Sequence, residues 1–186
     1  THGNLISRML KDGSLSTDYA SSSVSYANEK EPHRMIALSA GKFADITVDK
    51  LAQLGGALFS IVKAHKIKEI DVIFSSQIEA MRAANFAFGA KLKNYSFDHY
   101  KSPEKLGDNF IPSAMNFVTS EEREAIEFYA ELSSVADGVH FARDLISEPP
   151  NVLFPESYAN RCKDLSKIGL KVEILDVKDM KKLGMH

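Results

Sequence analysis

The feature that most constrains this chain is a long helical pattern that ends at two consecutive prolines. Between residues 119 and 148, apolar side chains recur at alternating steps of three and four residues. They are Ala125, Phe128, Leu132, Val135, Val139, Ala142 and Ile146. This spacing predicts one helix with an apolar stripe along one face. Thr119 and Glu122 form a capping-box sequence at its start. Pro149 and Pro150 end it, because proline has no amide hydrogen to continue the ladder.

A helix of this length allows two interpretations. It would extend about 40 Å at about 1.5 Å per residue, which exceeds the width of a small domain. It either lies along the core of one domain or connects two domains. We favour a connecting helix, because the composition changes immediately after the prolines. The predicted organisation is therefore a domain at 1–118, a connecting helix at 119–148 and the beginning of a second domain at 149–186.

The segment before this helix alternates short apolar runs with helical patterns. The first expected elements are a helix at 5–11 and a weak strand at 23–26. Strands follow at 34–39, 67–74 and 113–118, with one helix between each strand and the next. Asp45 or Thr47 is expected to cap the first of these two intervening helices. Ser76 and Glu79 form a capping box for the second. Strands that alternate with helices indicate an α/β layer rather than separate α and β regions.

A second set of elements begins after the prolines. Pro155 is favoured in the first turn of a helix, which Gly169 is expected to close. The run at 171–175 (KVEIL) predicts a strand, and Asp176 is expected to cap a final short helix that ends at Gly184. These elements break off before they form a domain, so we interpret the chain as a fragment.

Composition excludes several classes of protein. The net charge of −2 argues against a nucleic-acid-binding arm and against a polybasic membrane surface. No apolar run approaches the roughly 20 residues needed to span a bilayer. Cys162 is the only cysteine, which excludes a disulfide within the chain and a four-cysteine zinc site. A single cysteine fits a reducing compartment, so we expect a cytoplasmic protein.

Few residues follow a pattern typical of a metal site. The histidines are His2, His33, His65, His99, His140 and His186. No two of them have the four-residue spacing of a helical zinc motif. We interpret His140, beside the apolar stripe, as a hydrogen-bonded structural histidine. Asp144 and Glu148 are four residues apart, so a metal pair is conceivable there. For Glu121, Glu122 and Glu124, stabilisation of the helix start by the helix dipole is the ordinary explanation.

The remaining candidates also favour structural roles. Gly41 and Lys42 follow a strand and have the sequence of a small anion nest, but a common α/β turn is the better interpretation. Gly55–Gly56 predicts close helix packing. Cys162 is interpreted as a buried thiol, and the aromatic segment 95–101 as a loop packed by its own rings. The residue chemistry alone predicts no catalytic, cofactor-binding or metal-binding residue.

Several motifs in the second half resemble one known family. Residues 94–101 (NYSFDHYK) are similar to a Y-x-F-D-x-Y-K loop, and residues 142–151 (ARDLISEPPN) to an A-R-D-L-x-N-x-P-P-N segment. Ser147 departs from the usual asparagine. The runs 152–155 (VLFP) and 183–186 (LGMH) follow in the same order. Together the motifs resemble the cytosol (leucyl) aminopeptidases, the M17 peptidase family, over about residues 34–186.

This resemblance implies a fold and an activity. The expected fold is a macro-domain-like, three-layer α/β/α amino-terminal domain that lacks its first strands, then the interdomain helix and the first elements of an α/β catalytic domain. The family removes amino-terminal residues, often leucine, from peptides, using two divalent metals (zinc or manganese) and a bridging water. The family forms homohexamers. For this protein we expect peptide substrates, a cytoplasmic location and no membrane or nucleic-acid partner.

The resemblance does not extend to the family's catalytic residues. Its metal ligands are a lysine, aspartates and a glutamate, partly within an N-T-D-A-E-G-R segment that is absent here. We therefore assign no catalytic, cofactor or metal residue to this chain and expect the fragment to be inactive. The alternative is a non-enzymatic, macro-like module that acts in ligand binding or oligomerisation.

Overall fold

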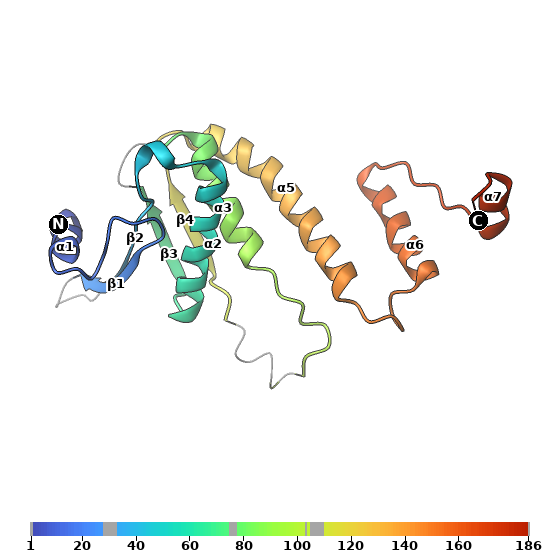
Figure 1. Ribbon diagram of the computed structural model, residues 1–186, viewed down its shortest axis with the longest axis horizontal. Helices are drawn as coiled ribbons and strands as arrows, with labels where there is room; N and C mark the ends of the chain where they lie inside the picture. The colour runs from blue at the N-terminus through green and yellow to red at the C-terminus, as the bar shows by residue number, and fades with distance from the viewer. Residues whose placement is uncertain (1, 28–32, 75–77, 103, 105–109, 186) are drawn as a thin grey trace. The chain divides into compact units, whose positions relative to one another are not determined.

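The computed structural model describes residues 2–27, 33–74, 78–102, 104 and 110–185 (Figure 1). The chain divides into two compact units, Thr1–His140 and Phe141–His186. The division falls inside one helix, α5 (Glu122–Ser147). The predicted domain boundaries at 118/119 and 148/149 stay predictions. None of the described helices is both long and apolar enough to cross a membrane.

The first unit alternates helices and strands as predicted. In chain order it contains α1 (His2–Lys11), β1 (Ser22–Ala27), β2 (His33–Leu38), the 3₁₀ turn η1 (Phe43–Asp45), α2 (Val48–Ala64), β3 (Glu69–Ile73), α3 (Ala80–Lys93) and β4 (Ala114–Val118). α5 follows β4. The α/β class is therefore confirmed.

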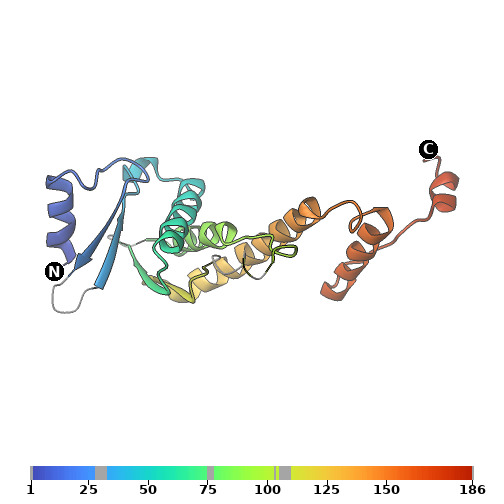
Figure 2. The same cartoon turned by 90° about the horizontal axis from the view of Figure 1, so that it is seen from below.

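The described strands form two separate pairs. β1 and β2 are antiparallel, with Val24 opposite Ile36, whereas β3 and β4 are parallel, with Val72 opposite Phe117. Parallel neighbours need a crossover, which α3 provides. Figure 2 shows the blue β1–β2 pair apart from the green β3 strand.

The core of this unit lies between the β3–β4 pair and the helices α2 and α3. Leu51, Leu54, Leu58 and Val62 recur along one face of α2 and are all buried. Phe86 of α3 completes this cluster, with its ring 5.6 Å from Phe74 and 6.1 Å from Phe117 in edge-on geometry. Such pairs stabilise a core beyond the area they bury.

Two glycines allow α2 and α3 to approach closely. A Cβ atom on Gly55 would overlap the carbonyl oxygen of Phe86, and one on Gly89 would overlap the carbonyl oxygen of Ala52. The close packing predicted for Gly55–Gly56 is thus confirmed at Gly55. Gly56 has only an ordinary contact, because its Cβ would lie 3.5 Å from the nearest oxygen.

We expect Gly89→Ala to lower the free energy of unfolding by about 3 kcal/mol, because the methyl group meets rigid backbone rather than a movable side chain. Gly138→Ala is the matched control, since a Cβ there meets nothing within 4 Å. It should raise stability by up to about 1 kcal/mol through helix propensity alone. Urea unfolding followed by circular dichroism measures both. Equal stability of the two variants would contradict the close contact.

The caps of the helices differ partly from those predicted. Thr47, one of the two expected caps, accepts a hydrogen bond from the Lys50 amide at 3.3 Å and begins α2. The prediction that Ser76 and Glu79 form a capping box was wrong, since α3 begins only at Ala80, with Glu79 as its N-cap residue. Ser76 itself lies outside the described residues. Glu79 makes no side-chain capping bond.

A residue distant in sequence supplies the missing cap of α3. The Ala80 amide donates a hydrogen bond to Oε2 of Glu121 at 2.7 Å. The predicted capping box of Thr119 and Glu122 was also wrong. Thr119 Oγ1 accepts a hydrogen bond from the Glu121 amide instead, and α5 begins only at Glu122. Glu121 therefore links the start of α5 to the start of α3.

Glu121→Ala is expected to lower stability by about 1–2 kcal/mol, the usual cost of losing a helix cap. Glu131→Ala on α5 is the control, because the described contacts include none made by this exposed side chain. Its effect should stay within about 0.5 kcal/mol. Chemical denaturation of the two variants makes the comparison. A Glu121 variant as stable as the Glu131 variant would rule out the cap.

The long helix α5 ends close to the prolines, as predicted, but its apolar stripe is largely exposed. Val135 and Ile146 are 55% and 84% exposed, and only Ala136 is buried. α5 is joined to α3 through Lys91, whose Nζ lies 2.7 Å from Asp137 Oδ1 and 3.1 Å from the Ser133 carbonyl. The stripe is thus not a core-facing surface within the described chain.

The second unit contains α6 (Pro155–Asp164), the 3₁₀ turn η2 (Leu165–Ile168) and α7 (Val177–Lys182). Gly169 ends η2 with φ of +92°, and Asp176 caps α7 by accepting from the Asp179 amide at 2.9 Å, both as predicted. The strand predicted at 171–175 was wrong, since this segment has no regular structure. A strand needs a neighbour to pair its amides, and no strand is described in this unit.

Candidate functional site

The described residues contain no metal site. They include no group of three or more His, Cys, Asp or Glu side chains placed to hold an ion. The Asp144–Glu148 pair considered from the sequence does not form one. Glu148 instead bonds to Arg161, with Oε1 2.7 Å from the guanidinium Nη2. The zinc or manganese ions implied by the resemblance therefore do not fit the described part of this chain.

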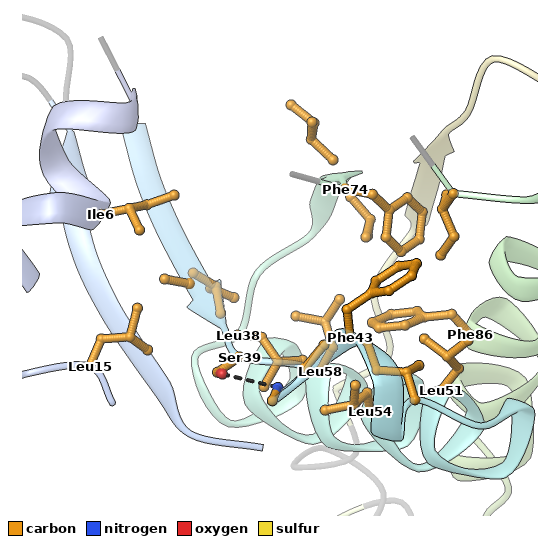
Figure 3. A pocket seen from close by; sticks show the side chains of 18 of the residues that line it. Ile6, Leu15, Leu38, Ser39, Phe43, Leu51, Leu54, Leu58, Phe74 and Phe86 are labelled. Carbon is orange, nitrogen blue, oxygen red and sulfur yellow. Dashed lines mark hydrogen bonds between the residues drawn. The ribbon is translucent and has the colours of Figure 1, made fainter. Parts of the chain in front are cut away.

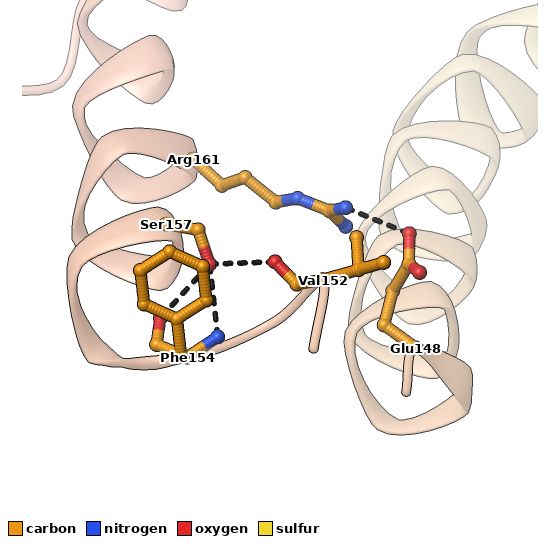
Figure 4. A network of polar contacts seen from close by, with 5 residues as sticks. All are labelled: Glu148, Val152, Phe154, Ser157 and Arg161. Atoms are coloured by element: carbon orange, nitrogen blue, oxygen red, sulfur yellow. Dashed lines mark hydrogen bonds and ion pairs between the residues drawn. The ribbon is translucent and has the colours of Figure 1, made fainter. Parts of the chain in front are cut away.

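Glu148 belongs to a polar network that follows the end of α5 (Figure 4). Its carboxylate is 6% exposed, and Arg161 reaches it from α6. In the same turn, the Ser157 hydroxyl donates to the Val152 carbonyl at 2.8 Å and accepts from the Phe154 amide at 2.9 Å. These bonds fix the turn after the two prolines and the entry of α6. Every polar atom named here has a protein partner, so the network stabilises this turn.

Arg161→Ala removes the partner of the nearly buried Glu148 carboxylate. The control, Lys167→Ala, removes the partner of Asp164 in a pair whose two side chains are both well exposed. We expect the first change to weaken α6 by about 2 kcal/mol and the second by less than about 0.5 kcal/mol. Amide hydrogen exchange along α6 measures this difference locally. Exchange that speeds up equally in both variants would show that the Glu148 pair has no special role.

His140 fits the predicted structural role only partly. Its ring stacks on Tyr95, with centroids 5.3 Å apart. Its Nε2 atom is buried and has no hydrogen-bond partner among the described residues, whereas a hydrogen-bonded histidine was expected. The contact joins the segment after α3 to α5.

The other candidates have local structural roles. Cys162 is half-buried rather than buried, and its hydrogen bond with Tyr158 raises the pKa of that phenol. Gly41 adopts φ of +75° and donates its amide to Ser39 Oγ at 3.2 Å, so this amide is not free to bind an anion. The turn interpretation of Gly41–Lys42 is consistent with this bond.

The aromatic loop at 95–101 packs on itself, as predicted. The Phe97 ring lies 5.2 Å from His99 and 5.7 Å from Tyr100. Lys101 Nζ pairs with Asp98 Oδ1 at 2.5 Å. These contacts hold the loop together through its own side chains.

A feature that the sequence analysis missed is an apolar crevice in the first unit (Figure 3). Its volume is about 540 Å³, and β2 and β3 both line it. Leu51, Leu54 and Leu58 of α2 lie on one side, with Phe86 of α3 beside them. Ile6 and Leu15 line its other end. The sequence did show the apolar strands at 34–39 and 67–74, which line this crevice. It does not show which strand edges are left unpaired, and the crevice depends on those edges.

Comparisons with known proteins agree with the resemblance seen in the sequence. Residues 1–104 match the N-terminal domain of the cytosol aminopeptidase family. A probable cytosol aminopeptidase of Bradyrhizobium sp. is 36% identical over 154 residues, covering 82% of this chain and 31% of that protein. One from Rhizobium etli is 38% identical over 157 residues, with the same coverage. The chain thus spans about a third of the length of these relatives.

Two kinds of solved structure share the fold. A mutant of tomato leucine aminopeptidase aligns with 98% of this chain and 37% of its own, at a TM-score of 0.81 and 20% identity. The bottromycin maturation enzyme BotP in complex with Mn aligns with 94% of this chain and 36% of its own, at a TM-score of 0.73 and 20% identity. The family match covers more than half of the 186 residues. This chain therefore belongs to the cytosol aminopeptidase family, whose N-terminal domain it contains.

Proposed function

We propose that the full-length protein is a metal-dependent leucyl aminopeptidase that removes amino-terminal residues from peptides. The observation that carries this proposal is the match of residues 1–104 to the family's N-terminal domain. The alignment with probable cytosol aminopeptidases covers 82% of the chain, more than that domain alone. The motif at 142–151, with its two prolines, adds support from the second unit.

We assign 1–118 to the amino-terminal domain, 119–148 to the connecting helix and 149–186 to the beginning of the catalytic domain. The two divalent ions, manganese or zinc, would bind outside these residues, since no described group of ligands suits them. The Mn complex of BotP, a protein with the same fold, supports a metal-dependent reaction. The contribution of this chain is then to support and assemble the enzyme rather than to perform its chemistry.

We further propose that the full-length protein acts in the cytoplasm as a homohexamer. The names of the relatives support the location. The exposed apolar stripe of α5, which includes Val135 and Ile146, offers a surface that a second copy can cover. The same stripe favours the alternative function, a non-enzymatic binding or oligomerisation module.

An assay with leucine p-nitroanilide separates these two functions. The purified full-length protein should release nitroaniline, lose this activity with a chelator and regain it with manganese or zinc. The 186-residue chain alone should release none under any condition. Full-length protein that is folded but inactive with every metal would contradict the peptidase proposal and leave the binding module.

A further inference from the structure

One face of α5 attaches to α3 and to the segment after α3 through polar side chains. Ser133, Asp137 and His140 recur at steps of four and three residues, so they lie on one face of the helix. Lys91 of α3 binds the first two, with its Nζ 2.5 Å from Ser133 Oγ and 2.7 Å from Asp137 Oδ1. Tyr95, in the segment after α3, contacts the third. This polar face, rather than the exposed apolar stripe, holds α5 in place.

His140 makes the last of these contacts along the helix. The first compact unit ends at this residue. The contact with Tyr95 therefore decides how far along α5 the attachment extends. Without it, the nearest preceding contact is the pair of Lys91 and Asp137, about one helical turn earlier.

The environment of the His140 ring suits a neutral imidazole. The ring lies against that of Tyr95, with centroids 5.3 Å apart and planes tilted by 39°. Its Nε2 atom is buried and has no hydrogen-bond partner among the described residues. A buried neutral nitrogen loses one hydrogen bond to water, whereas a buried N–H that carries positive charge loses far more. Proton binding at Nε2 therefore costs more in the closed contact than in a ring exposed to water.

The charged groups around His140 do not offset this cost. The helix and α3 contribute two carboxylates and two cations within about one turn of the ring, namely Asp137, Asp144, Lys91 and Arg143. These groups leave no net charge beside the ring, and both carboxylates already have partners. In the segment after α3, Tyr95 presents an uncharged phenol, and Asp98 and Lys101 neutralise each other. The burial of Nε2 therefore decides the effect of a proton.

We propose that His140 and Tyr95 form a pH-sensitive latch on α5. While the imidazole is neutral, the ring contact is closed and α5 is attached as far as His140. When Nε2 takes up a proton, the contact opens so that the charged ring reaches water, and the attachment ends at the pair of Lys91 and Asp137. A histidine side chain ordinarily changes charge at about pH 6.5, so the latch is closed above this range and opens as the pH falls through it. This regulation of the helix does not depend on the proposed peptidase activity.

Amide hydrogen exchange of the full-length protein tests the latch. Exchange is measured at about pH 5 and about pH 8, and the intrinsic effect of pH on exchange is corrected for. We expect the protection of residues 138–142 on α5 to be about tenfold lower at the acidic pH, because this turn loses its contact with Tyr95. Protection of the turn at Ser133 should stay unchanged, since its bonds to Lys91 involve no group that titrates near neutral pH.

Two variants provide the matched comparison. His140→Phe keeps a ring against Tyr95 but has no nitrogen to protonate, so protection at 138–142 should differ by less than about twofold between the two pH values. His99, the other histidine of the segment after α3, contacts Phe97. His99→Gln should therefore keep the full change seen in the wild type. His140→Gln replaces the first variant if that protein fails to fold, because its amide is also uncharged at both pH values.

Three results would overturn the proposal. One is wild-type protection at 138–142 that is equal at both pH values, which would mean that Nε2 has a hydrogen-bond partner in the full-length protein. Another is a change of the same size in His140→Phe, which would assign the pH dependence to a different group. The third is higher protection at the acidic pH, which would show that a carboxylate such as Asp144 binds the charged ring.

Discussion

The close contact of α2 with α3 is the constraint on which the first unit depends. Gly55 and Gly89 bring each helix backbone against the other, with no room for a side chain between them. This approach allows the apolar face of α2 and Phe86 of α3 to share one core with β3 and β4. Two helices held further apart would leave the small β3–β4 pair without enough buried surface, because two strands alone are barely stable in water.

Most of the element order followed from local patterns in the sequence. The steps of three and four in α2, the short apolar runs of β2 and β3 and the prolines after α5 all act within a few residues. Predictions failed where a distant partner decides the structure. Glu121 replaces the expected Ser76 box at the start of α3, although 41 residues separate it from Ala80. The run at 171–175 lacks a neighbouring strand, so its strand propensity has no effect.

The candidate site illustrates the same limit from the functional side. The sequence offered Asp144 and Glu148 as a conceivable metal pair. The pattern of Asp144 and Glu148 could be judged only with the structure, since Arg161 approaches from the next helix. The sequence showed the apolar strands that line the crevice but not the crevice itself, because it depends on which edges of β2 and β3 stay unpaired.

The exposed surfaces of the first unit point to a structure that is completed by more protein. Ile73 of β3 and Val118 of β4 are register partners on the outer face of their pair, and they are 74% and 54% exposed. Ile73 also lines the crevice, and Val135 of α5 is 55% exposed. An independent domain of this size normally buries such surfaces, because exposed apolar patches favour association. The first unit therefore presents apolar surface that another segment of protein can cover.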